Sequence, residues 1–252
     1  GGSNEEKNDG AKSAQEQAPS QTNDAIIASK TVDDHFRLDI EVCLTCTCCG
    51  FHRTKEETYR YLSIDIADDD DSESDATTME PNARLQRSVK ECLARFFQPE
   101  EREINCEKCE EGKTALQTMK VLSRPKALLL HLKRFGIVER HIPSLHGPSS
   151  MQYVVQKNKS AIRLTSQLSL DPFRDATEDN KGYYIRSIVH HEGSTANSGH
   201  YTADAVREDE DGDMQWVSFD DGRVHKSSPE HILRDASKQK TAYMLLYSLF
   251  DD

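Results

Sequence analysis

Two strand-like segments joined by an acidic, glycine-containing turn constrain the fold of this chain more than any other feature. Residues 202–207 (TADAVR) and 214–219 (MQWVSF) each have the composition of a β-strand, and the run 208–213 (EDEDGD) between them is typical of a hairpin loop. An antiparallel hairpin folded about position 210 pairs residues whose numbers sum to about 420. That register predicts that His200, at the start of one strand, faces Asp220, at the end of the other.

A histidine oriented by a carboxylate is two-thirds of a nucleophilic triad. His200 follows a polar loop that ends in Gly199, which permits another chain to approach closely. Asp220 is followed by a second carboxylate, Asp221, which can bind a substrate or a neighbouring loop. A core histidine bonded to a nearby aspartate is the alternative interpretation, and these residues alone leave both open.

Four of the seven cysteines form two CxxC pairs: Cys46, Cys49, Cys106 and Cys109. Each pair follows a predicted strand, and two such pairs can supply the four thiolates of a tetrahedral zinc site. Gly50 relieves crowding beside the second thiolate, which favours Cys46 and Cys49 over the overlapping choice that uses Cys43. The long gap between the pairs predicts two separate hairpins of an elongated projection. Buried free thiols or a redox pair are the alternative, and Cys43, Cys48 and Cys92 are not expected to be ligands.

The charge and the cysteine content restrict the class of protein. A formal net charge of −12 disfavours nucleic acid as a partner, and with it a zinc-ribbon nucleic-acid binder. No run of eighteen apolar residues occurs, so we expect no membrane span. Because no secretory leader is recognisable, thiols bound to a metal in a reducing compartment are favoured over disulfides. We therefore expect an intracellular protein of the cytoplasm, the nucleus or both.

The chain is expected to divide into a disordered tail or linker (1–30) and one domain (31–252). Strands are predicted at 35–42, 59–66, 118–121, 127–134, 183–189, 202–207, 214–219 and 243–249. A capping box predicts a helix from Ser88 to about Gln98, and Ser228-Pro229 predicts the start of another. The acidic run at 67–82 is expected to be an exposed loop. The segment 136–180 gives only a weak signal.

Several of these motifs occur in one order along the chain. They are the two CxxC pairs, YLSIDI (61–66), Phe96-Phe97, LLLHLKRF (128–135), Tyr184 with Val189 and His191, SGHY (198–201), Trp216 with FDD (219–221), and YMLLY (243–247). Over about residues 35–250, this order resembles the ubiquitin-specific protease family of cysteine deubiquitinases. The resemblance implies an α+β fold of the papain-like superfamily, with zinc-ribbon fingers (about 36–120) and an antiparallel β palm (about 121–252).

The resemblance also implies roles for individual residues. His200 matches the general base, Asp220 the residue that orients it, and Asp221 a supporting carboxylate. The loop from His190 to Gly199 matches a blocking loop that moves aside for the C-terminal tail of ubiquitin, with four expected substrate-binding residues: His190, His191, Gly199 and Tyr201. The zinc ion would be structural. The implied partner is ubiquitin or a ubiquitinated protein, and the implied reaction is hydrolysis after the terminal glycine of ubiquitin.

The chain departs from the family pattern in one respect. The nucleophile box, an Asn-x-Cys sequence at a helix start, is not found in this sequence, nor is the stretch that follows it. Most of the thumb of the right-hand fold is therefore expected to be missing. A general base that has no thiol to deprotonate cannot catalyse covalent acyl transfer. The isolated chain is therefore predicted to be inactive until the N-terminal half of the domain is supplied in cis or in trans. The alternative is a catalytically dead ubiquitin-binding scaffold, against which the retained His200 and Asp220 argue.

Overall fold

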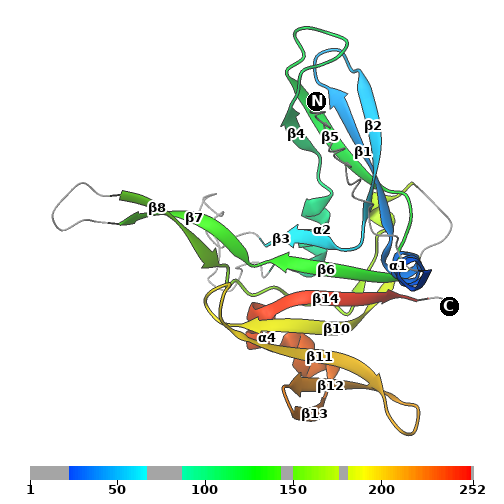
Figure 1. The fold of residues 1–252 in the computed structure, drawn as a ribbon, viewed down its shortest axis with the longest axis vertical. Coiled ribbons are helices and arrows are strands. Elements are labelled where there is room, and N and C mark those ends of the chain that lie inside the picture. The colour runs from blue at the N-terminus through cyan, green and yellow to red at the C-terminus, as the bar shows by residue number, and fades with distance from the viewer. Residues whose placement is uncertain (1–22, 67–86, 143–149, 176–180, 251–252) are drawn as a thin grey trace, which may run out of the picture.

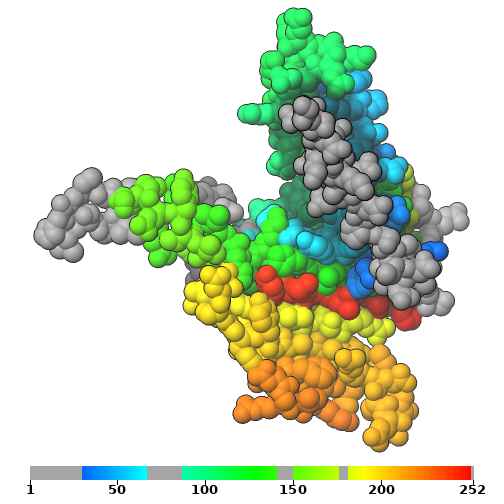
Figure 2. Space-filling model, in the orientation of Figure 1, coloured from blue at the N-terminus to red at the C-terminus, as the bar shows by residue number. Residues whose placement is uncertain are grey.

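A computed structural model describes residues 23–66, 87–142, 150–175 and 181–250. Within these ranges the fold is α+β, with mostly antiparallel strands in three sheets of four, eight and two strands. The four-stranded sheet and the two-stranded hairpin project as two arms from the eight-stranded sheet (Figures 1 and 2). This arrangement confirms the expected fold class. None of the helices in the described ranges is both long and apolar enough to span a bilayer.

The four-stranded sheet forms an arm that we call the finger sheet. Its strand order is β2-β1-β5-β4, and all neighbours are antiparallel. The strands are β1 (Leu38–Cys46), β2 (His52–Tyr59), β4 (Glu100–Glu103) and β5 (Thr114–Val121). The β1–β2 turn and the segment between β4 and β5 lie at one end of this sheet, where each carries a CxxC pair. The two separate hairpins expected from the sequence are therefore confirmed.

The eight-stranded sheet, which we call the palm sheet, forms the body of the molecule. Its order is β13-β12-β11-β10-β14-β6-β3, with β9 also paired to β10. The strands are β3 (Leu62–Asp65), β6 (Ala127–Lys133), β9 (Gln167–Leu168), β10 (Tyr183–Glu192), β11 (His200–Glu208), β12 (Met214–Asp220), β13 (Arg223–Ser227) and β14 (Ala242–Leu249). Among the described strands of this sheet, β3 and β6 are paired in parallel and the other neighbours are antiparallel.

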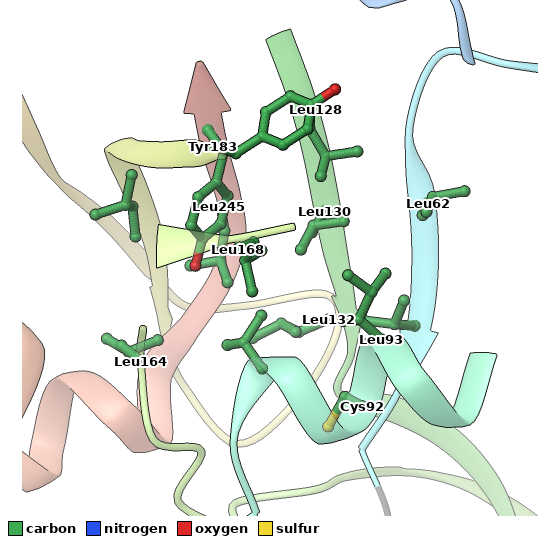
Figure 3. Close-up of a cluster of buried hydrophobic side chains, with 14 of the residues drawn as sticks. Leu62, Cys92, Leu93, Leu128, Leu130, Leu132, Leu164, Leu168, Tyr183 and Leu245 are labelled. Carbon is green, nitrogen blue, oxygen red and sulfur yellow. The ribbon is translucent and has the colours of Figure 1, made fainter. Parts of the chain in front are cut away.

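Helix α2 (Val89–Phe96) covers the core beside β3 and β6. Ser88 caps it: the amide of Glu91 donates to the Ser88 hydroxyl, and the Glu91 carboxylate accepts from the Ser88 amide, which confirms the predicted capping box. Cys92 and Leu93 on its inner face lie among buried leucines of the palm (Figure 3). Both α2 and β3 lie within 36–120, so the elements of finger and palm alternate along the chain. The proposed boundary between fingers and palm therefore stays a prediction.

Three short helical segments follow α2 in the described part of the chain. They are α3 (Pro229–Arg234), α4 (Ala236–Thr241) and the 3₁₀ turn η2 (Asp171–Phe173). Helix α3 begins where Ser228-Pro229 predicted it, with the Ser228 hydroxyl accepting from the His231 amide. Helix α4 follows at once from its cap Asp235 and was not predicted, because its sequence ASKQKT has no apolar stripe.

The hairpin of β7 (Phe135–Ile142) and β8 (Ser150–Lys157) extends away from the palm (Figure 1). It lies in the segment that gave only a weak sequence signal. Apolar and polar residues are mixed on both faces, because no sheet in the described residues lies beneath it: Ile137 and Tyr153 are more than 70% exposed. Strict alternation, the signal of a half-buried strand, is therefore missing.

Arg134 joins the base of this hairpin to the palm. Its guanidinium is fully buried and donates to four main-chain carbonyls: Ala242 at 2.5 Å, Gln239 at 2.7 Å, Ser160 at 3.1 Å and Asn158 at 3.2 Å. Burial lowers its pKa to about 10, which leaves it charged at neutral pH. These bonds fix the segment after β8 against the junction of α4 and β14.

Near the N-terminus the structure differs from the expectation. Helix α1 (Asn23–Phe36) includes residues 23–30, which were expected to belong to a disordered tail, and it includes His35, where a strand was expected to begin. The alternation from residue 35 belongs to β1 only from Leu38 onward. The predicted strand 59–66 is divided between two sheets, because the chain leaves the finger sheet at Tyr59 and enters the palm at Leu62. The acidic run 67–82 lies outside the described residues.

Candidate active site and metal centre

His200 and Asp220 are in direct contact at one end of the palm sheet. The two atoms joined are His200 Nε2 and Asp220 Oδ1, 2.5 Å apart. His200 is the first residue of β11 and Asp220 the last of β12, as the hairpin argument predicted. Their side chains are 44% and 40% exposed, so the pair is accessible to a reacting group.

The register of this hairpin is two residues away from the predicted one. Ala203 pairs with Phe219, and Glu208 with Met214, so the turn is centred near residue 211. Asp209 explains the displacement, because its carboxylate accepts from the amides of Asp211 and Asp213 and closes the turn around them. A shift of two residues keeps every side chain on its face. His200 therefore reaches Asp220 as a diagonal neighbour rather than as a direct partner.

The charges around the pair favour a specific protonation state. The hydrogen bond to Asp220 raises the pKa of His200, against a smaller opposing effect of desolvation, and Asp221 and Glu192 add to the rise. The same bond lowers the pKa of Asp220. With Asp220 ionised, Nε2–H of His200 donates to it, and the lone pair of a neutral imidazole lies on Nδ1. No hydrogen bond to Nδ1 is found among the described residues, so this atom is available to accept a proton.

Asp221 is held beside the pair by a two-residue turn. Asp220 pairs with Arg223, so Asp221 and Gly222 alone connect β12 to β13. Asp221 has φ +50°, the left-handed region that aspartate tolerates better than most residues. A carboxylate oxygen of each aspartate and a ring nitrogen of His200 all lie within 4.8 Å of one another. The turn thus places a second carboxylate at the candidate site.

The predicted blocking loop is shorter than expected. His190 and His191 belong to β10 and are each 1% exposed, so the connection between β10 and β11 is 193–199. Glu192 pairs with His200, and His191 with Tyr201. Tyr201 is exposed, and its ring lies 4.8 Å from that of His191. The expected contacts of His190, His191, Gly199 and Tyr201 with substrate stay predictions.

Glycine is required at both ends of this loop. A Cβ at Gly199 would overlap the His191 ring and lie 2.6 Å from the Glu192 carbonyl oxygen. Gly193 has φ +158°, and a Cβ there would lie 2.7 Å from the Ser198 carbonyl oxygen. The two ends of the loop are therefore in backbone contact.

The sequence did not reveal a buried hydrogen-bond network that lies further along the same hairpin. Asp204, fully buried on β11, accepts from Ser218 Oγ at 2.5 Å, from Lys238 Nζ at 2.6 Å, and from His190 Nε2 at 2.9 Å. Because its members come from β10, β11, β12 and α4, no local sequence motif predicts the network. Asp204 and Ser218 are direct partners across the hairpin that carries His200 and Asp220. The network therefore fixes the register that brings that pair together.

Acid is expected to weaken this network. Burial alone would raise the pKa of Asp204, but the hydrogen bonds from His190, Lys238 and Ser218 outweigh it and lower the pKa from 3.8 to about 2. Because the folded pKa is the lower one, the stabilisation is present above about pH 4 and is lost as the pH falls through about 2. A shift of this size corresponds to about 2 kcal/mol. Asp204→Asn should therefore lower the free energy of unfolding by at least that amount at pH 7.

The measurement is urea unfolding of the wild type and Asp204→Asn at pH 7 and pH 3. The difference between the two proteins should be smaller at pH 3. Asp213→Asn, a substitution at an exposed position in the adjacent turn, is the matched control. It should lower the free energy of unfolding by less than about 0.5 kcal/mol, as is usual for surface substitutions. An equal difference at both pH values would contradict the assignment of the effect to the carboxylate of Asp204.

The four CxxC sulfurs gather at the end of the finger sheet. Cys46 Sγ lies 3.9 Å from Cys109 Sγ, Cys49 Sγ lies 3.7 Å from Cys106 Sγ, and all four atoms lie within 4.8 Å of one another. A zinc tetrahedron with Zn–S bonds of about 2.3 Å has sulfur–sulfur edges of about 3.8 Å. The spacing of the sulfurs therefore fits a zinc ion.

The backbone around the sulfurs fits an ion as well. Gly50 has φ +72°, and its amide donates to the Cys46 carbonyl, so the glycine after the second thiolate closes a tight turn. A Cβ at Gly112 would lie 2.6 to 2.8 Å from Cys46 Sγ, Cys106 Cβ and Cys109 Sγ. The Lys108 amide donates to Cys106 Sγ, and such a hydrogen bond favours the thiolate form. These features favour a thiolate cluster over a set of buried free thiols.

The other three cysteines lie apart from this cluster. Cys43 is half-buried within β1, Cys48 is exposed in the turn, and Cys92 is buried on α2. The choice of Cys46 and Cys49 over the pair that uses Cys43 is consistent with this geometry.

Comparisons with known proteins agree with the fold. The family model described as ubiquitin carboxyl-terminal hydrolase matches residues 8–247. Ubiquitin carboxyl-terminal hydrolase 10 of Saccharomyces cerevisiae is 30% identical over 69% of this chain and 20% of its own length. Ubiquitin carboxyl-terminal hydrolase 3 of Mus musculus is 29% identical over 81% of this chain and 36% of its own length.

Solved structures show the same fold. The SAGA DUB module that contains Ubp8 and is bound to monoubiquitin matches with a TM-score of 0.62 and 24% identity, over 87% of this chain and 42% of the matched chain. A second structure of the yeast module matches with a TM-score of 0.65 and 22% identity, over 92% and 46%. The chain belongs to the ubiquitin carboxyl-terminal hydrolase family. It spans less than half the length of these relatives.

Proposed function

We propose that this chain is part of a thiol-dependent deubiquitinase, which hydrolyses the isopeptide or peptide bond after the C-terminal glycine of ubiquitin. One observation carries the proposal: Asp220 holds Nε2 of His200, and Nδ1 is left without a hydrogen bond among the described residues. A general base needs this arrangement, because the carboxylate selects the tautomer whose lone pair faces the nucleophile. Membership of the family and the monoubiquitin bound to one structural neighbour support ubiquitin as the partner.

The geometry supports the following steps. Nδ1 of His200 takes the proton of a cysteine thiol, and the thiolate attacks the carbonyl carbon of the terminal glycine. The imidazolium then gives its proton to the leaving amine, so that a thioester and a free amine result. Water hydrolyses the thioester with His200 again as base, which releases the carboxylate and restores the thiol. Asp220 stabilises the imidazolium, and Asp221 adds negative charge beside it.

The nucleophile in this scheme comes from a part of the protein outside these 252 residues. All seven cysteines have other positions, six in the finger sheet and its end and one on α2. We therefore propose that an N-terminal half of the catalytic domain, in cis or in trans, completes the site, and that the chain alone is inactive. We also propose that the protein acts inside the cell, in the cytoplasm, the nucleus or both.

The finger sheet and the loop 193–199 would bind ubiquitin in this proposal. Cys46, Cys49, Cys106 and Cys109 would hold a structural zinc ion, which would cross-link the two turns at the end of the fingers. Its chemistry there is structural, because four thiolates leave no open coordination position. Gly199 and Tyr201 would guide the tail of ubiquitin toward His200, and His190 and His191, each 1% exposed, would support them from within β10.

The test uses ubiquitin with a C-terminal electrophile that captures a catalytic thiol. The chain alone should give no covalent product, and the chain supplied with the N-terminal half of the domain should be labelled. Ubiquitin binding by the chain is measured in parallel. If the completed protein binds ubiquitin but is not labelled, a catalytically dead ubiquitin-binding scaffold is the better description.

A further inference from the structure

Lys157 is a buried ammonium at the point where the β7–β8 hairpin meets the palm sheet. It is the last residue of β8, pairs with Phe135, and is 6% exposed. Among the described residues no carboxylate forms an ion pair with it. A charged group in such a place must be held by hydrogen bonds, because an unpaired buried charge is costly. The partners of Lys157 therefore indicate what it does.

All three donors of the ammonium are used, and all three acceptors lie at the end of β10. Lys157 Nζ lies 2.6 Å from the carbonyl oxygen of His191, 2.9 Å from that of Gly193, and 3.1 Å from Nδ1 of His191. The two carbonyls lie on either side of Glu192, the residue that pairs with His200. The ammonium thus fixes the strand end against which His200 is placed.

The contact with Nδ1 also fixes the tautomer of His191. An ammonium can only donate, so Nδ1 must accept, and the proton of the neutral ring must be on Nε2. Burial and the charge of Lys157 both lower the pKa of His191, which agrees with a neutral ring. The Nε2 edge faces Gly199, where a Cβ would overlap the ring. Phe135 and Tyr201 enclose the imidazole, with ring centroids 5.4 Å and 4.8 Å away.

We propose that Lys157 is a positioning residue for His200. It holds the carbonyls on both sides of Glu192 and sets the tautomer of His191, whose ring supports Gly199, the neighbour of His200. Through these contacts it couples the base of the β7–β8 hairpin to the candidate general base, although Lys157 itself does not touch His200. The inference rests on the proposed function only for the role of His200. The contacts themselves are tested without activity.

The first experiment measures the tautomer of His191 in the zinc-loaded chain of residues 1–252. Proton–nitrogen correlation spectra of histidine-labelled protein distinguish the two ring nitrogens, and His191→Asn assigns the signals. Nδ1 should be unprotonated and Nε2 protonated at pH 7. A proton on Nδ1 would overturn the proposal without any variant of Lys157. A merely space-filling lysine would not determine which nitrogen carries the proton.

The second experiment compares variants of Lys157 with a matched control. Lys157→Met keeps the side-chain length but removes the positive charge and the hydrogen-bond donors. Lys157→Arg keeps the charge and the donors. Lys159→Met makes the same change at an exposed position two residues later. Lys157→Met should raise the pKa of His191 and shift the amide signals of 193–199, because a positive neighbour is lost while the ring stays buried. Lys157→Arg should restore most of the wild-type spectrum, and Lys159→Met should leave it unchanged.

Activity gives a separate readout in the completed enzyme. Lys157→Met should lower kcat about 10- to 100-fold with a smaller change in KM, since a small misplacement of a catalytic group has effects of this size. If the wild-type completed enzyme is inactive, the proposed function fails, but the spectra still decide the role of Lys157. If Lys157→Met and Lys159→Met give the same spectra, or if kcat is unchanged in an active enzyme, Lys157 is not a positioning residue. If Lys157→Met does not fold, the tautomer of His191 in the wild type alone decides whether Lys157 is a positioning residue.

Discussion

Replacement of Cys106 by serine is expected to abolish stoichiometric zinc binding, from one ion per chain to less than a tenth of that at micromolar free zinc. The substitution removes one of four thiolates from a cluster whose sulfur spacing fits a tetrahedral ion. Binding of structural zinc contributes about 10–16 kcal/mol in small domains, and part of that free energy stabilises the fold around the ion. The turns at the end of the finger sheet should therefore lose their order while the palm stays folded, because the finger residues in the core, Leu38, Ile40 and Val121, lie at the opposite end of β1 and β5.

Zinc content by elemental analysis and hydrogen exchange of the finger amides measure the two effects. Cys48→Ser is the matched control, because Cys48 lies between two of the clustered cysteines in the β1–β2 turn, is exposed, and does not belong to the cluster. It should keep one zinc ion per chain and the wild-type exchange pattern. Full zinc occupancy in Cys106→Ser would exclude the assignment of Cys106 as a ligand. Loss of zinc from both variants would mean that the ion is held by a different set of cysteines.

The parts of the fold that the sequence predicted are those set by local patterns. The capping box at Ser88 placed the start of α2, and the acidic turn at 208–213 brought His200 to Asp220 despite a register error of two residues. The predicted contact still forms despite this error, because a shift by an even number of residues keeps each side chain on the same face of the sheet. The gathering of the four CxxC sulfurs was expected because the spacing within each pair is itself a local pattern.

The parts that the sequence did not predict depend on contacts between distant segments. Arg134 binds carbonyls up to 108 residues away, and Asp204 binds side chains from three other elements. Lys157 reaches across 34 residues to His191. Each of these residues is polar, and a polar residue in a sequence is normally assigned to the surface. Their burial becomes apparent only when the topology places their acceptors around them.

The largest expected effect on activity concerns His200 and Asp220 in the completed enzyme. His200→Gln removes the lone pair that accepts the thiol proton, and general-base catalysis contributes about 10²–10⁴-fold. Asp220→Asn leaves the His200 ring in place but no longer favours the tautomer in which Nδ1 carries no proton. The corresponding change in a well-studied triad lowers kcat about 10⁴-fold. We expect each variant to lower kcat/KM at least 100-fold, and Asp221→Asn to have a smaller effect, because Asp221 adds charge and holds no proton of the ring.

The effect of Asp220 on the protonation of His200 can be measured in the isolated chain without any activity. Because the bond to Asp220 raises the pKa of His200, Asp220→Asn should lower the midpoint of the His200 titration followed by NMR. Asp213→Asn, in the turn of the same hairpin, should leave that midpoint in place. A midpoint that does not move in Asp220→Asn would show that the carboxylate does not act on the ring. A moved midpoint without loss of activity in the completed enzyme would instead mean that Asp220 orients a histidine that is not the base, since a base whose tautomer and charge are disturbed cannot keep its rate.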